Sequence, residues 1–102
     1  TISAAHSAEL KGAAAISALN GKSFVCKFGS DSLSVKFAGV AADSQKIPFV
    51  VKLGSRKIKN HYRLKKNGKL VDKSGSSRRV FTSQNGIDIK VSGGPTAKCT
   101  PQ

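Results

Sequence analysis

One of the chain's two histidines and its only tyrosine stand side by side, at His61 and Tyr62. An imidazole can transfer protons near neutral pH, and an aromatic ring can stack on a nucleic-acid base. Both residues lie in the stretch from Lys52 to Arg79, which holds eleven basic residues and a single acid, Asp72. A pair that could do chemistry is therefore embedded in a field that attracts polyanions.

The candidate nucleic-acid-binding residues of this stretch are those that could stack on a base, hold a phosphate or add positive charge. They are His61, Tyr62, Arg78, Lys57, Lys59 and Lys65. Arg78 and Arg79 could each hold phosphate with a planar guanidinium, but neighbours on a strand point to opposite faces. The alternative is that none of these residues binds a ligand. His61 and Tyr62 would then lie on a strand where one side chain packs and the other is solvated, and the lysines would only keep the protein soluble.

The length and the net charge of the chain limit the classes of protein to which it can belong. A chain of 102 residues is one domain, and its net charge of +13 predicts salt-sensitive attraction to nucleic acid or anionic surfaces. No apolar run is long enough to insert into a membrane, and we expect a monomer. No catalytic Ser/His/Asp order, glycine-rich phosphate loop or metal cluster occurs, so we expect no cofactor and no metal. Without an initiator methionine or signal peptide, Thr1 is expected to begin a mature or trimmed product.

Two cysteines, Cys26 and Cys99, lie 73 positions apart. This spacing excludes a CxxC redox motif, and two cysteines with two histidines make a poor zinc site. A disulfide would close a long loop, stabilise the fold by ~4 kcal/mol and imply an oxidising compartment, hence secretion. Two free buried thiols are the alternative.

Local patterns predict a small α+β domain. Residues 1–22 are rich in alanine and read as a loosely docked helical arm, in which His6 is exposed and has no role. Alternation predicts strands at 23–28 and 87–91. Further strands are expected at 47–53, 58–64 and 79–82, with a turn at 66–69 and a short tail that carries Cys99. Residues 31–43 fit a strand through Leu33, Val35 and Phe37, or a helix whose apolar face holds Leu33, Phe37 and Val40, and local signals do not decide between them.

Several features in this order resemble the secreted fungal guanyl-specific ribonucleases, and more closely their non-catalytic relatives, the RNase-like effectors of powdery mildew haustoria. They are the Phe24-Val25-Cys26 motif, the segment 31–43 at the place of the family helix, Pro48 at the entry to the sheet, NHYRLKKNGKL, RRVFTSQNGIDIKVSGG and the final KCT. The resemblance implies a ribonuclease-like domain over residues 23–102, with one main α-helix packed on a small antiparallel β-sheet, a weakly structured N-terminal arm, and a Cys26–Cys99 disulfide. A helix within 30–43 would support the family, whereas a strand there in an all-β barrel would refute it.

The resemblance also places the catalytic positions one by one. The family's tyrosine before the proline and histidine after it fall on Ile47 and Phe49, its glutamate base on or beside His61, and its phosphate-binding arginine on Arg78. Its histidine acid falls near Ser92 or Gly93. Since cleavage through the 2′-hydroxyl needs both a base and an acid, the resemblance implies a pseudo-ribonuclease with no catalytic residues. A two-histidine nuclease that uses His6 and His61 is the enzymatic alternative.

The resulting expectation is a secreted fungal virulence effector without ribonuclease activity, delivered into plant host cells. It would bind RNA through low-specificity electrostatics, host plant proteins, or both, and plant immune receptors could recognise it. The alternative is a small secreted cationic antimicrobial or inhibitor protein that binds an acidic partner.

Overall fold

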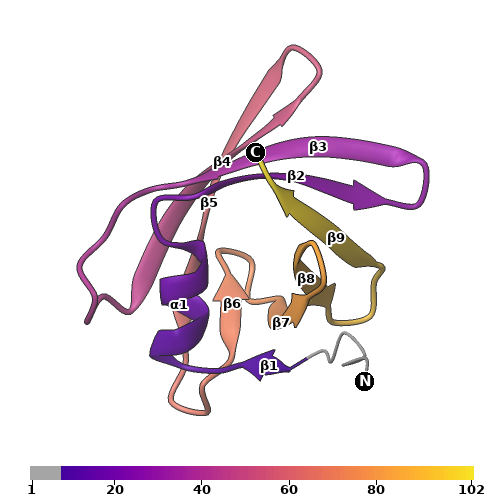
Figure 1. Cartoon of the computed structure of the whole chain (residues 1–102). Helices are drawn as coiled ribbons and strands as arrows, with labels where there is room; N and C mark the ends of the chain where they lie inside the picture. Colours follow the sequence, from indigo (N-terminus) through magenta and orange to yellow (C-terminus); the bar gives the residue numbers. More distant parts are fainter. Residues whose placement is uncertain (1–7) are drawn as a thin grey trace.

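The fold is an antiparallel barrel in which each strand from β2 to β8 pairs with the next one along the chain (Figure 1). The computed structural model describes residues 8–102. The barrel strands are β2 (Ser23–Phe28), β3 (Asp31–Phe37), β4 (Lys46–Leu53), β5 (Arg56–Leu64), β6 (Leu70–Asp72), β7 (Ser77–Ser83), β8 (Gly86–Val91) and β9 (Thr96–Pro101). The last strand, β9, pairs with β8 and also with β2, so the meander closes on itself.

Alternating side chains fill the inside of the barrel. Phe37 and Ile47 from β3 and β4 are at most 1% exposed, and Leu70 and Val80 from β6 and β7 are equally buried. The outward neighbours on the same strands are largely lysine, serine and arginine. This period of two is what a sheet with one buried and one solvated face requires.

The N-terminal segment contributes to this core. Helix α1 (Ala13–Leu19) buries Ile16 and Leu19 in the same hydrophobic cluster as the barrel strands, and the short strand β1 (Glu9–Leu10) pairs with β7. The helix that was predicted within residues 1–22 therefore exists but is packed, not loosely docked. His6 lies outside the described residues, and the division of the chain at residue 22 stays a prediction.

The predicted α+β class, with one main helix on a small sheet, is wrong. The segment 31–43 begins as strand β3, whose Leu33, Val35 and Phe37 turn toward the barrel interior. Strand β3 is bonded on one edge to β2 and on the other to β4. A helix in place of β3 would leave the facing edges of β2 and β4 unpaired. The sequence of residues 31–43 alone does not show that these two strands lie beside it. The ribonuclease-like architecture is overturned with it.

Most individual strands were located correctly from the sequence. The structure confirms strands at all five predicted positions and the turn at 66–69, where Gly68 has a φ of 83°. The tail was misjudged, because residues Thr96–Pro101 form β9. Its inward residues are Ala97 and Cys99, which are too small to mark a strand by hydrophobicity.

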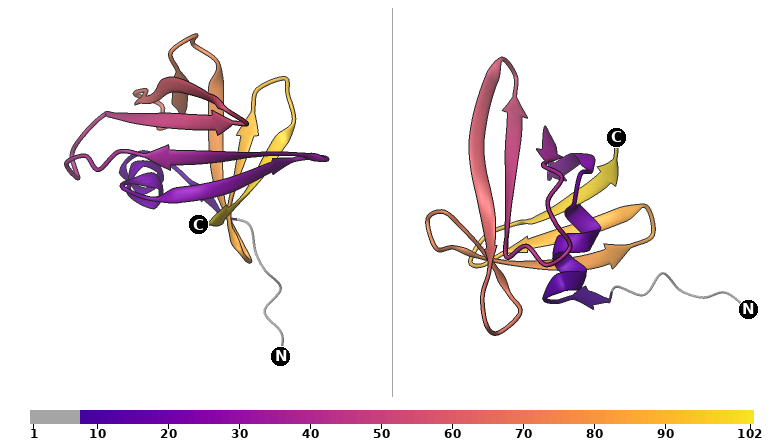
Figure 2. Two further views of the ribbon diagram at one scale, coloured as in Figure 1. Left: turned by 90° about the horizontal axis from the view of Figure 1, so that it is seen from above. Right: turned by 90° about the vertical axis from the view of Figure 1, so that its left-hand side faces the viewer.

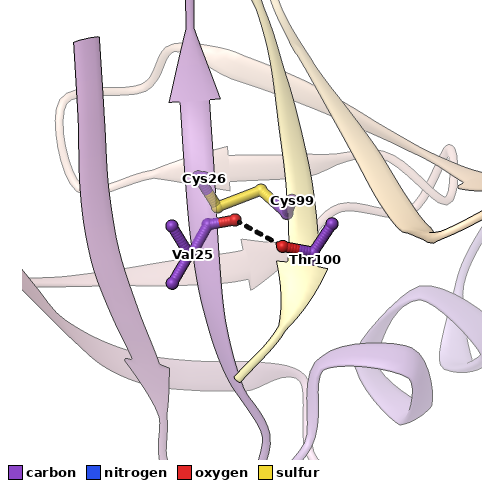
Figure 3. The surroundings of a disulfide bond; sticks show 4 residues. All are labelled: Val25, Cys26, Cys99 and Thr100. Atoms are coloured by element: carbon purple, nitrogen blue, oxygen red, sulfur yellow. Dashed lines mark hydrogen bonds between the residues drawn. A yellow bond between two sulfur atoms is a disulfide. The ribbon is translucent and has the colours of Figure 1, made fainter.

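The predicted disulfide joins Cys26 and Cys99 where the barrel closes (Figure 3). The two residues face each other in the register of β2 and β9, with their Cα atoms 4.0 Å apart. Beside them the hydroxyl of Thr100 donates to the carbonyl oxygen of Val25 at 3.5 Å. The bridge therefore links the first and last barrel strands covalently.

Removing the disulfide is expected to destabilise the barrel strongly. Closing a loop of 73 residues lowers the entropy of the unfolded chain, so Cys26→Ala with Cys99→Ala should cost ~4 kcal/mol in the free energy of unfolding. Urea denaturation of the double variant and of the oxidised protein measures the difference. A loss below about 1 kcal/mol would mean that the strand pairing closes the barrel without help from the bridge.

Candidate polyanion-binding face

Six cations project outward from three neighbouring strands, and we call them the basic face. They are Lys36 of β3, Lys46 and Lys52 of β4, and Lys57, Lys59 and Arg63 of β5. All six are exposed. Their positions alternate with the buried Phe37, Ile47 and Phe49, so the sequence period that builds the core also gathers these charges on one side.

Cross-strand register brings like charges directly opposite each other on this face. Lys52 stands opposite Lys57, and Lys46 opposite Arg63. Residues paired in this way have Cβ atoms about 4.5–5.5 Å apart, and like charges there are destabilising. No acidic residue occupies an outward position of β3, β4 or β5, so nothing within these described strands neutralises the pairs.

A groove of about 430 Å³ lies beside the Lys52–Lys57 pair. Lys36, Lys52 and Lys57 line it together with the polar side chains of Ser23, Ser34 and Gln102. Lys52 and Lys57 stand one pair before the end of the β4–β5 hairpin, and this hairpin extends beyond the rest of the barrel (Figures 1 and 2). Three ammonium groups with adjacent hydroxyl donors suit an anionic oxygen such as that of a phosphate.

Near β7, β8 and β9, acidic residues lie close to cations. The outward positions of the described strands β3, β4 and β5 hold no acidic residue. Glu9 of β1 bonds Arg79 through two contacts of 2.8 and 3.0 Å, and this hydrogen bonding holds the pKa of Glu9 below its usual value. Asp88 of β8 stands opposite Lys98 of β9. The outward cations of β3, β4 and β5 therefore form one group without acids, and the exposed Lys65, Lys66, Lys69 and Lys73 around β6 add further positive charge outside it.

The His61–Tyr62 pair is split between the two sides of β5. His61 is half-buried on the outer side, opposite Pro48 and between Lys59 and Arg63. Tyr62 is 6% exposed, and its ring centroid lies 4.5 Å from that of Phe49. Burial raises the pKa of the Tyr62 hydroxyl, and the enclosed ring presents no face on which a base could stack.

Arg78 is held by an internal network. Its guanidinium donates to a carboxylate oxygen of Asp72 at 3.0 Å and to the hydroxyl of Ser76 at 2.8 Å. Burial acts to raise the pKa of Asp72, but hydrogen bonds from Ser74 and Ser76 and the charge of Arg78 hold it below its usual value. Arg78 thus forms a salt bridge with Asp72, while the adjacent Arg79 forms one with Glu9 on the outside of the barrel.

Of the predicted lysines, Lys57 and Lys59 lie on the basic face, and Lys65 is exposed in the turn that follows β5. Sequence analysis missed Lys36 and Lys46, which precede the stretch from Lys52 to Arg79. The signal that would have found them is their alternation with Phe37 and Ile47, once residues 31–37 are recognised as a strand. The positions that the resemblance made catalytic, Ile47 and Phe49, are buried in the core.

The described part of the chain shows no group of three or more His, Cys, Asp or Glu side chains that could hold a metal ion. None of its helices has the length and hydropathy to cross a bilayer. No family model, curated protein or solved structure matches the chain. No comparison tests the relation to the mildew effectors, and by the criterion stated above strand β3 in a closed barrel counts against it.

Replacing Asp72 tests the network at the β6–β7 turn. Asp72→Ala removes the acceptor of Ser74 and Ser76 and leaves the half-buried Arg78 without its partner. We expect a loss of about 2–4 kcal/mol in the free energy of unfolding at pH 7, since buried polar groups left unpaired are costly. Chemical denaturation measures it, with Asp43→Ala in the exposed 38–45 loop as the control expected to stay within about 0.5 kcal/mol.

The same variant has a pH signature. Because the folded pKa of Asp72 is lowered, its carboxylate stabilises the protein above the unfolded value of about 4, and this contribution is lost as the pH falls through the folded pKa. The stability gap between the wild type and Asp72→Ala should therefore narrow below about pH 4. A gap that stays constant down to pH 2 would contradict the network.

Proposed function

We propose that this protein is a secreted binding protein for polyanions, and that its ligand is single-stranded RNA held on the basic face. The observation that carries the proposal is the pair of like-charge contacts, Lys52 with Lys57 and Lys46 with Arg63, on a face without acids. Such contacts oppose folding in the free protein, and a bound row of phosphates would relieve them. The Cys26–Cys99 disulfide is compatible with secretion.

Binding on this face would be electrostatic and nearly independent of sequence. Lysines act as point charges on phosphate oxygens and release counterions from the nucleic acid. No phenylalanine, tyrosine or tryptophan occupies an outward position of β3, β4 or β5 in the described chain, and the half-buried His61 is the one aromatic ring there, so base stacking would contribute little. Affinity should therefore fall steeply with salt and vary little with base composition.

The effector role rests on the resemblance alone, and the barrel architecture counts against that resemblance. Delivery into plant cells, recognition by a plant immune receptor and the absence of ribonuclease activity are predictions of that resemblance. The basic face and the resemblance share one biochemical prediction, which is that the protein binds RNA without cleaving it.

The face is tested by neutralising one of its opposed pairs. Lys52→Gln with Lys57→Gln should weaken binding of a fluorescent single-stranded RNA about ten-fold at low salt. It should also make the slope of log K against log salt shallower by about 1.4, since each phosphate contact contributes about 0.7 for single strands. Fluorescence anisotropy over a salt series measures both quantities.

The matched control is Lys66→Gln with Lys73→Gln, which removes the same two charges from exposed turns outside the basic face. Equal weakening by both double variants would mean that net charge alone drives binding, and would overturn the assignment to β3–β5. No binding by the wild type at low salt would favour a protein partner instead.

The same samples test for cleavage. RNA incubated with the wild type should remain intact on a denaturing gel, because His61 has no acid or second histidine at the outward positions of β4 and β5 around it. Turnover that His61→Ala abolishes would show the protein to be an enzyme.

A further inference from the structure

The barrel interior contains a second pocket, separate from the groove on the basic face. It has a volume of about 170 Å³, and its walls come from β2, β3, β4, β5, β7, β8 and β9. Most of the lining is apolar, including Phe28, Leu33, Val51, Ile89 and Val91. Phe28, Leu33, Val51 and Val91 are only half-buried, so the pocket opens to solvent on this side.

The apolar wall continues outward along the β4–β5 hairpin. Val51 lines the pocket and stands opposite Ile58 in the strand register. Leu53, two residues further along β4, lies on the same side as Val51. Leu53 and Ile58 are the two large hydrophobic residues that the described chain exposes most, at 45% and 40%. The hairpin projects from the barrel (Figures 1 and 2), and its side chains Leu53, Ile58 and Val51 form an apolar strip that leads to the pocket.

One wall of the pocket carries a hydrogen-bond donor. The side-chain oxygen of Asn60 accepts from the backbone N–H groups of His61 and Lys73 at 2.7 and 3.2 Å. These two donors fix the orientation of the amide group, because only its oxygen can accept from them. The amide nitrogen of Asn60 makes no hydrogen bond within the described residues and can donate to a ligand.

The charged group on the pocket wall is already compensated. Arg78 lines the pocket, but Asp72 neutralises it at 3.0 Å. A carboxylate ligand would have to compete with Asp72, whereas a neutral carbonyl oxygen needs only the Asn60 donor. The pocket therefore favours an uncharged polar group on an apolar body.

We propose that the barrel binds a small neutral carbonyl compound, about the size of one aromatic ring, with its oxygen on the amide nitrogen of Asn60. An apolar cavity of about 150 Å³ in another protein accommodates benzene, which sets the scale for this pocket. The interior of an eight-stranded barrel is either filled by side chains or holds one small ligand, and here the inward side chains leave this pocket between them. This site lies inside the barrel and is independent of RNA binding on the basic face.

The test compares acetophenone, which carries a carbonyl acceptor, with ethylbenzene, which carries none. Titration of each into the ¹⁵N-labelled full chain should shift the amide resonances of pocket residues such as Leu33, Val51 and Val91 in a saturable way. Acetophenone should bind about five-fold more tightly, as one net hydrogen bond provides.

Two variants locate the ligand. Asn60→Asp keeps the oxygen that His61 and Lys73 need but removes the donor, so it should abolish the preference for acetophenone and leave ethylbenzene binding unchanged. Val91→Phe fills the rim and should weaken both ligands, whereas Val25→Phe on the outer side of β2 should weaken neither.

Three results would overturn the proposal. They are the absence of saturable shifts in the wild type, shifts that survive Val91→Phe, and a preference for acetophenone that survives Asn60→Asp. The amide spectrum of each variant shows whether it is folded, so a loss of binding through misfolding is recognised directly.

Discussion

The closure of the sheet between β2 and β9 is the constraint on which the rest of the structure depends. Eight short strands joined only in series would leave two open edges, and the small apolar content of this chain would cover neither. Pairing of β9 with β2 removes both edges, and the Cys26–Cys99 bridge fixes that pairing covalently. Once the barrel is closed, every strand must send alternate residues inward, which decides where each lysine points.

The fold thereby separates two kinds of surface. Outside, β3, β4 and β5 place lysines opposite lysine and arginine, an arrangement that opposes folding unless an anion is bound. Inside, the same strands contribute Phe37, Phe49 and Tyr62 to one aromatic cluster, whose ring centroids are 4.5–6.0 Å apart. The free energy gained by aromatic packing on the inner side of these strands thus offsets the repulsion between like charges on the outer side.

The sequence predicted the strands better than the architecture. Alternation located β2 and β8, and local apolar residues such as Ile47, Tyr62 and Val80 located β4, β5 and β7. It left Asp31–Phe37 undecided, since Leu33 and Phe37 satisfy both a strand and a helix, and only pairing with β2 and β4 separates the two. It missed β9, whose inward residues are alanine and cysteine. It found the basic stretch but not the face, because cross-strand neighbours such as Lys46 and Arg63 are distant in sequence.

Footprinting of lysines with an amine-reactive reagent, read by mass spectrometry with and without single-stranded RNA, tests the central claim most directly. If RNA lies on the basic face, Lys36, Lys52 and Lys57 become protected, while Lys66, Lys73 and Lys98 react as they do in the free protein. Uniform protection of all lysines, or protection centred on Lys90 and Lys98, would contradict the account.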